Sequence, residues 1–397
     1  MILRRQLPVY SPIRLSAIAR AAFRTSEDAG RLSYHVVRER LADRFGAQAL
    51  ALTDSGTSAL VLALRLAVGQ GGTVAFPGYS CIDLAAAARL AGVRVRLYDV
   101  DPTTLSPDLD SVKRALQRGV DAVLVAHLYG YPADVPAVAE LSRPFGVTVV
   151  EDAAQGAGGM LRGSRSGAFG PLSVLSFGRG KGTTGGSGGA LMAVSRDWAD
   201  RINTACETLR KASRGWTDLA AAAAQWMFGR PSLYGFPAAI PILRLGEMVY
   251  HPAHEPASLS SGAAALVCDA LNMDDKEVEV RRHNVARLRA AATGSSLIPM
   301  EPVTGGIAGE LRFPVRSMNH APAPKLGIYR GYPQTLAEQP ELRPCLHDGE
   351  GEQVGALELR RSLLTLPSHS RLTSRDVANL QSWLRTPIAR ASHVTRG

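Results

Sequence analysis

Short apolar runs alternate with helical runs from about residue 34 to residue 194, and this rhythm constrains the fold more than any other feature. The apolar runs are continuous rather than alternating, which is typical of strands buried on both faces. The repeat therefore predicts an α/β fold with a mostly parallel sheet flanked by helices. The predicted strands are 49–53, 73–77, 93–101, 121–130, 147–154, 172–177 and 189–194. The predicted helices among them are 33–46, 56–69, 82–92, 109–119 and 135–146.

The rest of the chain predicts an insertion and a second domain. Residues 216–252 are apolar, rich in aromatic residues and interrupted by three prolines, and they follow a predicted helix at 198–213. A long helix is predicted from about residue 258 to 292, and a last helix at 374–385. We expect a large domain at 1–255, with 216–252 as its insertion, and a smaller C-terminal α+β domain at 256–397.

Composition excludes several classes of protein. The 397 residues carry a net charge of +10, but the arginines are scattered, so we expect no nucleic-acid partner. The four cysteines lie far apart without a CxxC pair, which argues against a zinc knuckle and fits a reducing cytoplasm. No apolar run approaches the roughly 18–20 residues of a spanning helix, and Pro8 interrupts any signal-like start.

Ligands of parallel sheets bind beyond the carboxyl ends of the strands, so residues directly after the apolar runs are the first candidates. Ser55, Gly56 and Thr57 follow the first predicted strand and open a helix. Free amides at a helix N-terminus form an anion site, although a simple helix cap explains the same residues.

Glu151 and Asp152 follow another predicted strand. A carboxylate there would pair with a cationic ring nitrogen or a metal, or serve as a cap or a structural salt bridge. No cluster of further ligands surrounds them in the sequence, so we expect no metal.

The loop from Ser176 to Gly189 holds Lys181 among many glycines. The loop fails the phosphate-loop pattern, because Leu175 and Gly182 stand where a glycine and a Ser/Thr are required. Lys181 is better suited to a Schiff base, while a flexible solvated loop is the alternative. A Schiff-base lysine, a carboxylate and a phosphate site are together what pyridoxal 5′-phosphate (PLP) requires.

The sequence resembles the DegT/StrS family of sugar aminotransferases, which have the PLP fold-type-I architecture. The matching residues are Ser55-Gly56-Thr57-Ser58-Ala59-Leu60, His127-Leu128-Tyr129-Gly130, Pro132-Ala133-Asp134, Glu151-Asp152-Ala153-Ala154-Gln155, Gly170, Ser176-Phe177, Lys181, Tyr332-Pro333 and Leu366-Pro367. The likeness is strong over about 35–200 and weaker over 256–386.

The resemblance implies roles for these residues. Lys181 would form the Schiff base and move the proton, and Asp152 would keep the pyridinium nitrogen charged. Gln155 would contact the ring, while Gly56, Thr57 and Ser176, with Ser55 beside them, would hold the phosphate. Members commonly form homodimers and move an amino group from glutamate or glutamine to a keto-sugar, often nucleotide-linked, in polysaccharide, envelope or secondary-metabolite biosynthesis.

Besides Ala337, which stands where many members carry histidine, three positions depart from the family pattern. Cys81 stands where members place an aromatic residue over the ring, so either Tyr79 would reach the ring or Cys81 itself would pack there. A family glutamate is replaced by Gly186 or Ser187, and the asparagine lent by a partner subunit falls near Pro256. These departures put the substrate in doubt more than the cofactor.

Two further questions stay open at this level. Residues 216–252 are either an interfacial segment on the inner face of a membrane or an arm over the sibling subunit or the active site. His127, His369 and Arg330 either touch substrate or serve structure. We expect a cytoplasmic aminotransferase; the alternatives are another PLP fold-type-I reaction or a non-catalytic regulatory or scaffold protein.

Overall fold

The computed structural model describes residues 4–25, 27–211, 213–240, 249–349 and 351–386. Its centre is a seven-stranded sheet in the order β1-β9-β8-β5-β4-β2-β3. Only β9 is antiparallel to its neighbours in this sheet, so the predicted mostly parallel sheet is confirmed. The strands are β1 (Ala49–Thr53), β2 (Thr73–Pro77), β3 (Arg94–Tyr98), β4 (Ala122–Ala126), β5 (Thr148–Asp152), β8 (Leu172–Ser176) and β9 (Gly189–Ala193).

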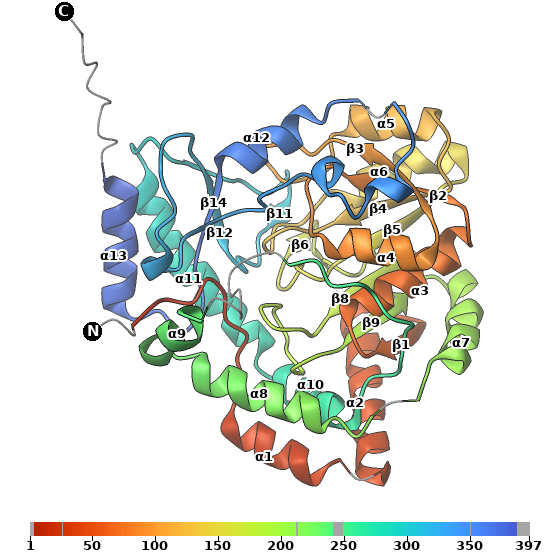
Figure 1. The fold of residues 1–397 in the computed structure, drawn as a ribbon, viewed down its shortest axis with the longest axis horizontal. Helices are drawn as coiled ribbons and strands as arrows, with labels where there is room; N and C mark the ends of the chain where they lie inside the picture. Colours follow the sequence, from red (N-terminus) through yellow and green to blue (C-terminus); the bar gives the residue numbers. More distant parts are fainter. Residues whose placement is uncertain (1–3, 26, 212, 241–248, 350, 387–397) are drawn as a thin grey trace, which may run out of the picture.

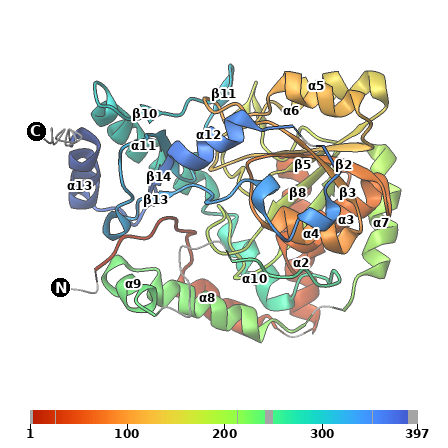
Figure 2. The same ribbon diagram turned by 45° about the horizontal axis from the view of Figure 1, so that its top comes forward.

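Helices cover both faces of this sheet (Figures 1 and 2). Alternate residues of a strand enter different cores: Leu124 packs with one group of helices and Val123 with the other. The first group is α3 (Gly56–Val68), α4 (Asp83–Ala91) and α7 (Ala199–Thr208), and the second is α5 (Leu109–Gln117) and α6 (Val135–Ser142). On the side of α5 and α6, α2 (Glu27–Phe45) and α10 (Ser261–Ala270) bury a further core against β1, β8 and β9.

The C-terminal part builds a second, four-stranded sheet in the order β10-β12-β14-β13. Its strands are β10 (Ile298–Pro299), β12 (Phe313–Arg316), β13 (Tyr329–Arg330) and β14 (Leu363–Leu366), and α11 (Asp274–Ala292) and α13 (Ser374–Arg385) pack on it. A small sheet of β6 (Met160–Leu161), β7 (Ser164–Arg165) and β11 (Gly306–Ile307) joins the two halves. The described chain also contains α12 (Val354–Ser362) and the 3-10 turns Arg143–Phe145, Arg196–Trp198, Pro324–Leu326, Leu336–Glu338 and Arg343–Cys345. The division at residues 255 and 256 stays a prediction.

The single long helix predicted from about 258 to 292 is wrong. The chain turns at 271–273, where the Met273 amide donates to the Ala270 carbonyl at 2.8 Å, and it divides into α10 and α11. Asp274 and Asp275 then occupy the first turn of α11, where negative charge stabilises the positive end of the helix dipole. The helical periodicity continues across this turn, which is why the sequence alone does not reveal it.

The insertion predicted at 216–252 begins with two helices, α8 (Trp216–Phe228) and α9 (Pro231–Ala238), while 241–248 lie outside the described residues. α8 packs against α1 (Leu15–Phe23) and α10 of its own chain (Figure 1). Apolar side chains of α1, α8 and α9 nevertheless remain exposed, among them Phe23, Trp216 and Phe236. Among the described helices, none combines the length and apolar character needed to cross a bilayer.

The N-terminal segment, residues 4–13, touches several distant parts of the molecule. Its backbone amides at Arg5 and Gln6 donate to the carbonyls of Pro231 and Lys325. The Leu7 carbonyl accepts a hydrogen bond from His369 Nε2 at 3.0 Å, and Ser11 Oγ donates to the Lys181 carbonyl. This segment therefore ties α9 and the loops around the four-stranded sheet to the glycine-rich loop.

Candidate active site

A cavity of ≈ 270 Å³ lies at the carboxyl edge of the large sheet. The edge is defined by the last residues of β4, β5 and β8, which are Ala126, Asp152 and Ser176, and all three line the cavity. The structure brings eight of the nine predicted site residues to this cavity: Ser55, Gly56, Thr57, Cys81, Asp152, Gln155, Ser176 and Lys181. Residues 126 positions apart in sequence thus meet at one place, because parallel strands end at the same edge.

The turn after β1 is both a helix cap and an anion site. Ser55 Oγ accepts a hydrogen bond from the Ser58 amide at 3.0 Å and donates to Ser58 Oγ at 2.9 Å, so its hydroxyl caps α3. Gly56 and Thr57 form the first turn of α3, and their amides have no backbone acceptor within the described chain. These two amides, rather than the Ser55 hydroxyl, are the groups available to bind a phosphate.

Gly56 packs tightly against Ser176 across the floor of the cavity. A Cβ added at Gly56 would lie 2.7 Å from Ser176 Cβ, closer than real carbon atoms approach. Only glycine therefore lets the start of α3 and the end of β8 present their polar groups to the same small volume. This cradle suits a compact anionic group such as a phosphate.

The two acidic residues at the end of β5 have separate roles. Glu151 is fully buried and accepts hydrogen bonds from His127 Nε2 at 2.7 Å and from the amides of Gly167, Phe169 and Gly170. Burial alone would raise the pKa of Glu151, but the His127 contact and these amides lower it. Glu151 is thus the structural member of the pair that the sequence left unresolved.

Asp152 is the member that faces the cavity. Its Oδ1 accepts a hydrogen bond from the Ala154 amide at 3.0 Å, and no described residue donates to Oδ2. Burial raises the pKa of Asp152, while the Ala154 amide and the charge of Lys181 act in the opposite direction. A buried carboxylate with a spare oxygen is what a protonated ring nitrogen requires.

Lys181 enters the cavity from the loop between β8 and β9. Within the described chain its amine forms no ion pair closer than 4.0 Å, while its carbonyl accepts a hydrogen bond from Ser11. The backbone of the loop is therefore held at Lys181, and the amine stays available for chemistry.

Cys81, the first departure from the family pattern, lines the cavity. Its Sγ donates to Asp83 Oδ2 at 3.3 Å. Burial and the neighbouring Asp83 carboxylate raise the pKa of the Cys81 thiol, so the group is a neutral thiol rather than a thiolate.

Of the two residues expected as alternatives beside the ring, Cys81 lines the cavity and Tyr79 does not. The Tyr79 hydroxyl accepts a hydrogen bond from the Tyr332 amide at 2.7 Å, and the Tyr79 ring lies 5.1 Å from that of Tyr332. Tyr332 lines the cavity instead, and its hydroxyl accepts a hydrogen bond from Gln155 Nε2 at 2.5 Å. Tyr79 therefore supports Tyr332 from behind.

Sequence reasoning missed Asp83 and the site position of Tyr332. Asp83 sits in the first turn of α4, two residues after Cys81, and its only sequence signal was its place after a strand. His127 also lines the cavity, but Glu151 and the Ala133 amide occupy its two ring nitrogens. His369 and Arg330 donate to the backbone carbonyls of Leu7 and Arg361 and do not line the cavity.

The other two departures also have defined surroundings. Ser187 lines the cavity and donates to Asp218 Oδ1 on α8 at 2.7 Å, so the inserted helix places a carboxylate beside the loop. Pro256 lies outside the cavity lining, and its carbonyl accepts a hydrogen bond from the Arg210 amide at 3.2 Å.

Comparison with known proteins agrees with this geometry. Residues 35–227 match the DegT/DnrJ/EryC1/StrS aminotransferase family. The L-glutamine:2-deoxy-scyllo-inosose aminotransferase of Streptomyces fradiae is 30% identical over 325 residues, covering 74% of this chain and 70% of that protein. The chain belongs to the DegT/DnrJ/EryC1/StrS aminotransferase family.

Two further similarities place this aminotransferase among its relatives. A dTDP-4-dehydro-2,3,6-trideoxy-D-glucose 4-aminotransferase of Saccharopolyspora spinosa is 38% identical over 149 residues, covering 37% of this chain and 39% of that one. The crystal structure of the aminotransferase TlmJ from Streptoalloteichus hindustanus superposes with a TM-score of 0.72 at 24% identity, covering 96% and 98% of the two chains. The fold is the PLP fold-type-I architecture, and aminotransferases of this family depend on PLP.

Proposed function

We propose that this aminotransferase uses PLP to move an amino group from glutamine or glutamate to a ketone carbon of a cyclitol or sugar. The observation that carries the proposal is the meeting of Lys181, Asp152 and the Gly56–Ser176 cradle in one cavity. A free amine, a buried carboxylate with a spare oxygen and two unpaired amides match the three polar parts of PLP.

Each of these residues has a task in the proposed reaction. The Gly56 and Thr57 amides and the Ser176 hydroxyl bind the phosphate, and Asp152 holds a proton on the ring nitrogen. Bound in this way, PLP supplies an electron sink for the carbon that carries the amine. Lys181 Nζ would hold the cofactor at its aldehyde group, and the freed amine would take the proton from the donor's α-carbon in the first half-reaction and deliver one to the acceptor's ketone carbon in the second.

The substrate class is inferred from the relatives. The relatives that align over most of this chain are named for a keto-cyclitol and L-glutamine, while shorter alignments are to enzymes named for dTDP- and UDP-linked sugars. We therefore place a cyclitol ketone first and a nucleotide-linked keto-sugar second. Asp83 and Tyr332 supply polar groups at the cavity that would meet substrate hydroxyls.

The experiment is to record the near-visible absorbance of the purified protein and to reduce it with borohydride before peptide mapping. We expect a yellow protein with a pyridoxyl adduct on Lys181, and no adduct in a folded Lys181→Ala variant. A Lys113→Ala variant is the matched control and keeps the adduct. A protein that takes up no added PLP would overturn the proposal and favour the regulatory or scaffold alternative.

The substrate is then tested directly. Amino transfer to 2-deoxy-scyllo-inosose and to a dTDP-4-keto-sugar is assayed with the untreated protein and with the borohydride-reduced protein. Each ketone is tested with L-glutamine and with L-glutamate as the donor. Amino transfer to either ketone supports the proposal. Turnover that releases water or carbon dioxide without amino transfer would point to another PLP fold-type-I reaction.

We further propose a cytoplasmic homodimer with two domains, at 1–255 and 256–397. The exposed apolar side chains of α1, α8 and α9, with relative exposures of 87% for Phe23 and 57% each for Trp216 and Phe236, support a contact with a second copy. Contact with the inner face of a membrane is the alternative for the same side chains.

A further inference from the structure

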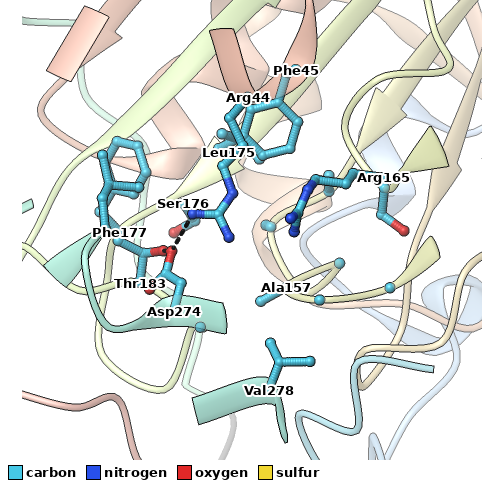
Figure 3. Close-up of a pocket in the computed structure, with 18 of the residues that line it drawn as sticks. Arg44, Phe45, Ala157, Arg165, Leu175, Ser176, Phe177, Thr183, Asp274 and Val278 are labelled. Carbon is cyan, nitrogen blue, oxygen red and sulfur yellow. Dashed lines mark hydrogen bonds and ion pairs between the residues drawn. The ribbon is translucent and has the colours of Figure 1, made fainter. Parts of the chain in front are cut away.

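A second cavity, shown in Figure 3, shares part of its lining with the candidate active site. Ala154 and Ser176 line both cavities, and Gly182 and Thr183, which follow Lys181, line the second one. Its volume is ≈ 50 Å³. Since about 10–15 Å³ of such space admits one water molecule, the cavity has room for a small ion but not for a cofactor or a sugar.

The lining of this second cavity is strongly positive. It contains three arginines, Arg44, Arg165 and Arg281, and a single carboxylate, Asp274. Figure 3 shows the guanidinium groups of Arg44 and Arg165 directed into the same space from opposite sides. Arg44 pairs with Asp274 at 3.5 Å and with Asp275 at 2.6 Å, and Arg165 pairs with Asp275 at 3.1 Å. These pairs balance the two outer arginines.

Arg281, in contrast, forms no ion pair with a described carboxylate. It is 1% exposed, and its Nε and Nη1 have no hydrogen-bond partner, while Nη2 donates to the Ala157 carbonyl at 3.2 Å. Within the described residues no carboxylate lies within 4.0 Å of it. Burial lowers the pKa of Arg281, against the attraction of Glu277 and Asp274. A buried guanidinium that lacks a partner strongly destabilises a native protein.

Ser166 adds a second unused donor. Its side chain is buried, lines the same cavity, and its Oγ has no hydrogen-bond partner. A Cβ added at Gly159 would lie 2.8 Å from this Oγ, and one added at Gly182 would lie 2.1 Å from Ala157 Cβ and 3.9 Å from Arg281 Nη1. Glycine at these two positions thus lets the backbone approach the donors and Ala157 closely.

The hydrogen-bond donors that lack a partner indicate which kind of ligand the cavity binds. Arg281 Nε and Nη1 can only donate, so the occupant must accept hydrogen bonds, and the excess positive charge favours an anion over water. We propose that this cavity binds a compact inorganic anion of about the size of chloride, held by Arg281 and Ser166 against the loop that carries Lys181. The site is separate from the proposed aminotransfer and does not depend on it.

The test is thermal unfolding of the purified full-length protein in sodium gluconate and in sodium chloride at equal ionic strength. An anion that binds only the native state at several times its Kd raises the Tm of a chain of this size by about 1–3 °C. We expect a saturable rise in chloride for the wild type and none for Arg281→Met. Arg287→Met, on the same helix, is the matched control and keeps the rise.

A second measurement uses the wild type alone, so that it stays informative if Arg281→Met does not fold. Crystals soaked in sodium bromide are measured at the bromine absorption edge, and an anomalous peak beside Arg281 Nη1 and Ser166 Oγ supports the proposal. Equal melting in both salts, or ordered water without an anomalous peak in the cavity, would overturn it.

Discussion

At the scale of single residues, the neighbouring carboxylates Glu151 and Asp152 have different roles: the first is structural and the second faces the cavity. Glu151 is saturated with hydrogen bonds, whereas Asp152 keeps one oxygen free. The sequence predicts both carboxylates at the end of a strand, but it does not show which of them faces the ligand. Their difference arises from β-strand alternation, which directs adjacent side chains to opposite faces of the sheet.

Asp152→Asn should leave the fold intact and lower kcat by about 10²–10³-fold, the usual cost of removing one preorganised electrostatic group. The reason is that an amide does not hold the proton on the cofactor ring nitrogen. Steady-state kinetics with saturating PLP measures the effect, and Asp134→Asn at the cap of α6 is the control. Wild-type turnover in Asp152→Asn would refute the role assigned to this residue.

Because the pKa of Glu310 is raised, we expect the free energy of unfolding to depend on pH. Burial raises the pKa of Glu310 to about 7, against the attraction of Arg289. The native state therefore binds a proton that the unfolded chain has lost, and stability falls as pH rises from about 4.5 to 7 and is then constant. The change is at most about 3 kcal/mol.

Glu310→Gln should remove this part of the pH dependence and raise the stability at pH 8 relative to the wild type. Urea unfolding at pH 5.5 and pH 8 measures it, with Glu352→Gln, which is exposed and is not among the main groups that shift the pKa of Glu310, as the control. An unchanged difference between the two pH values would contradict the assignment.

At the scale of elements, the strands and most helices of the large sheet followed from the sequence because their apolar runs are short, continuous and bounded by glycine. The turn at 271–273 did not, because Leu271 and Met273 continue a helical pattern through it. Tyr332 could not be assigned to the site either, because it follows β13 of the C-terminal sheet and meets Tyr79 only in three dimensions.

The link between α8 and the glycine-rich loop is testable through Asp218. Its two oxygens accept hydrogen bonds from Ser187 at 2.7 Å and from Ser260 at 2.5 Å. Asp218→Ala should lower the free energy of unfolding by about 2 kcal/mol, because two hydrogen bonds to a charged group are lost, and should weaken PLP binding. Thr217→Ala, exposed on the same helix, should do neither, and equal behaviour of the two variants in urea titrations would contradict the link.

At the scale of the whole molecule, the exposed apolar face of α1, α8 and α9 predicts self-association. We expect sedimentation at about twice the 42.2 kDa of the chain, and a monomer when Phe23 and Phe236 are both replaced by Ser. Ile298→Ser, equally exposed but on β10, should stay a dimer. A wild-type monomer that sediments with anionic lipid vesicles would favour the membrane alternative.

The N-terminal segment has a consequence for the order in which the protein is made. Residues 5–11 leave the ribosome before their hydrogen-bond partners Lys181, Lys325 and His369. At about 5–20 residues per second, the segment waits on the order of 20–70 seconds for the last of them. Ser11 can therefore fasten the loop of Lys181 well before Leu7 meets His369, so the contacts of this segment should form in stages during synthesis and be complete only after residue 369.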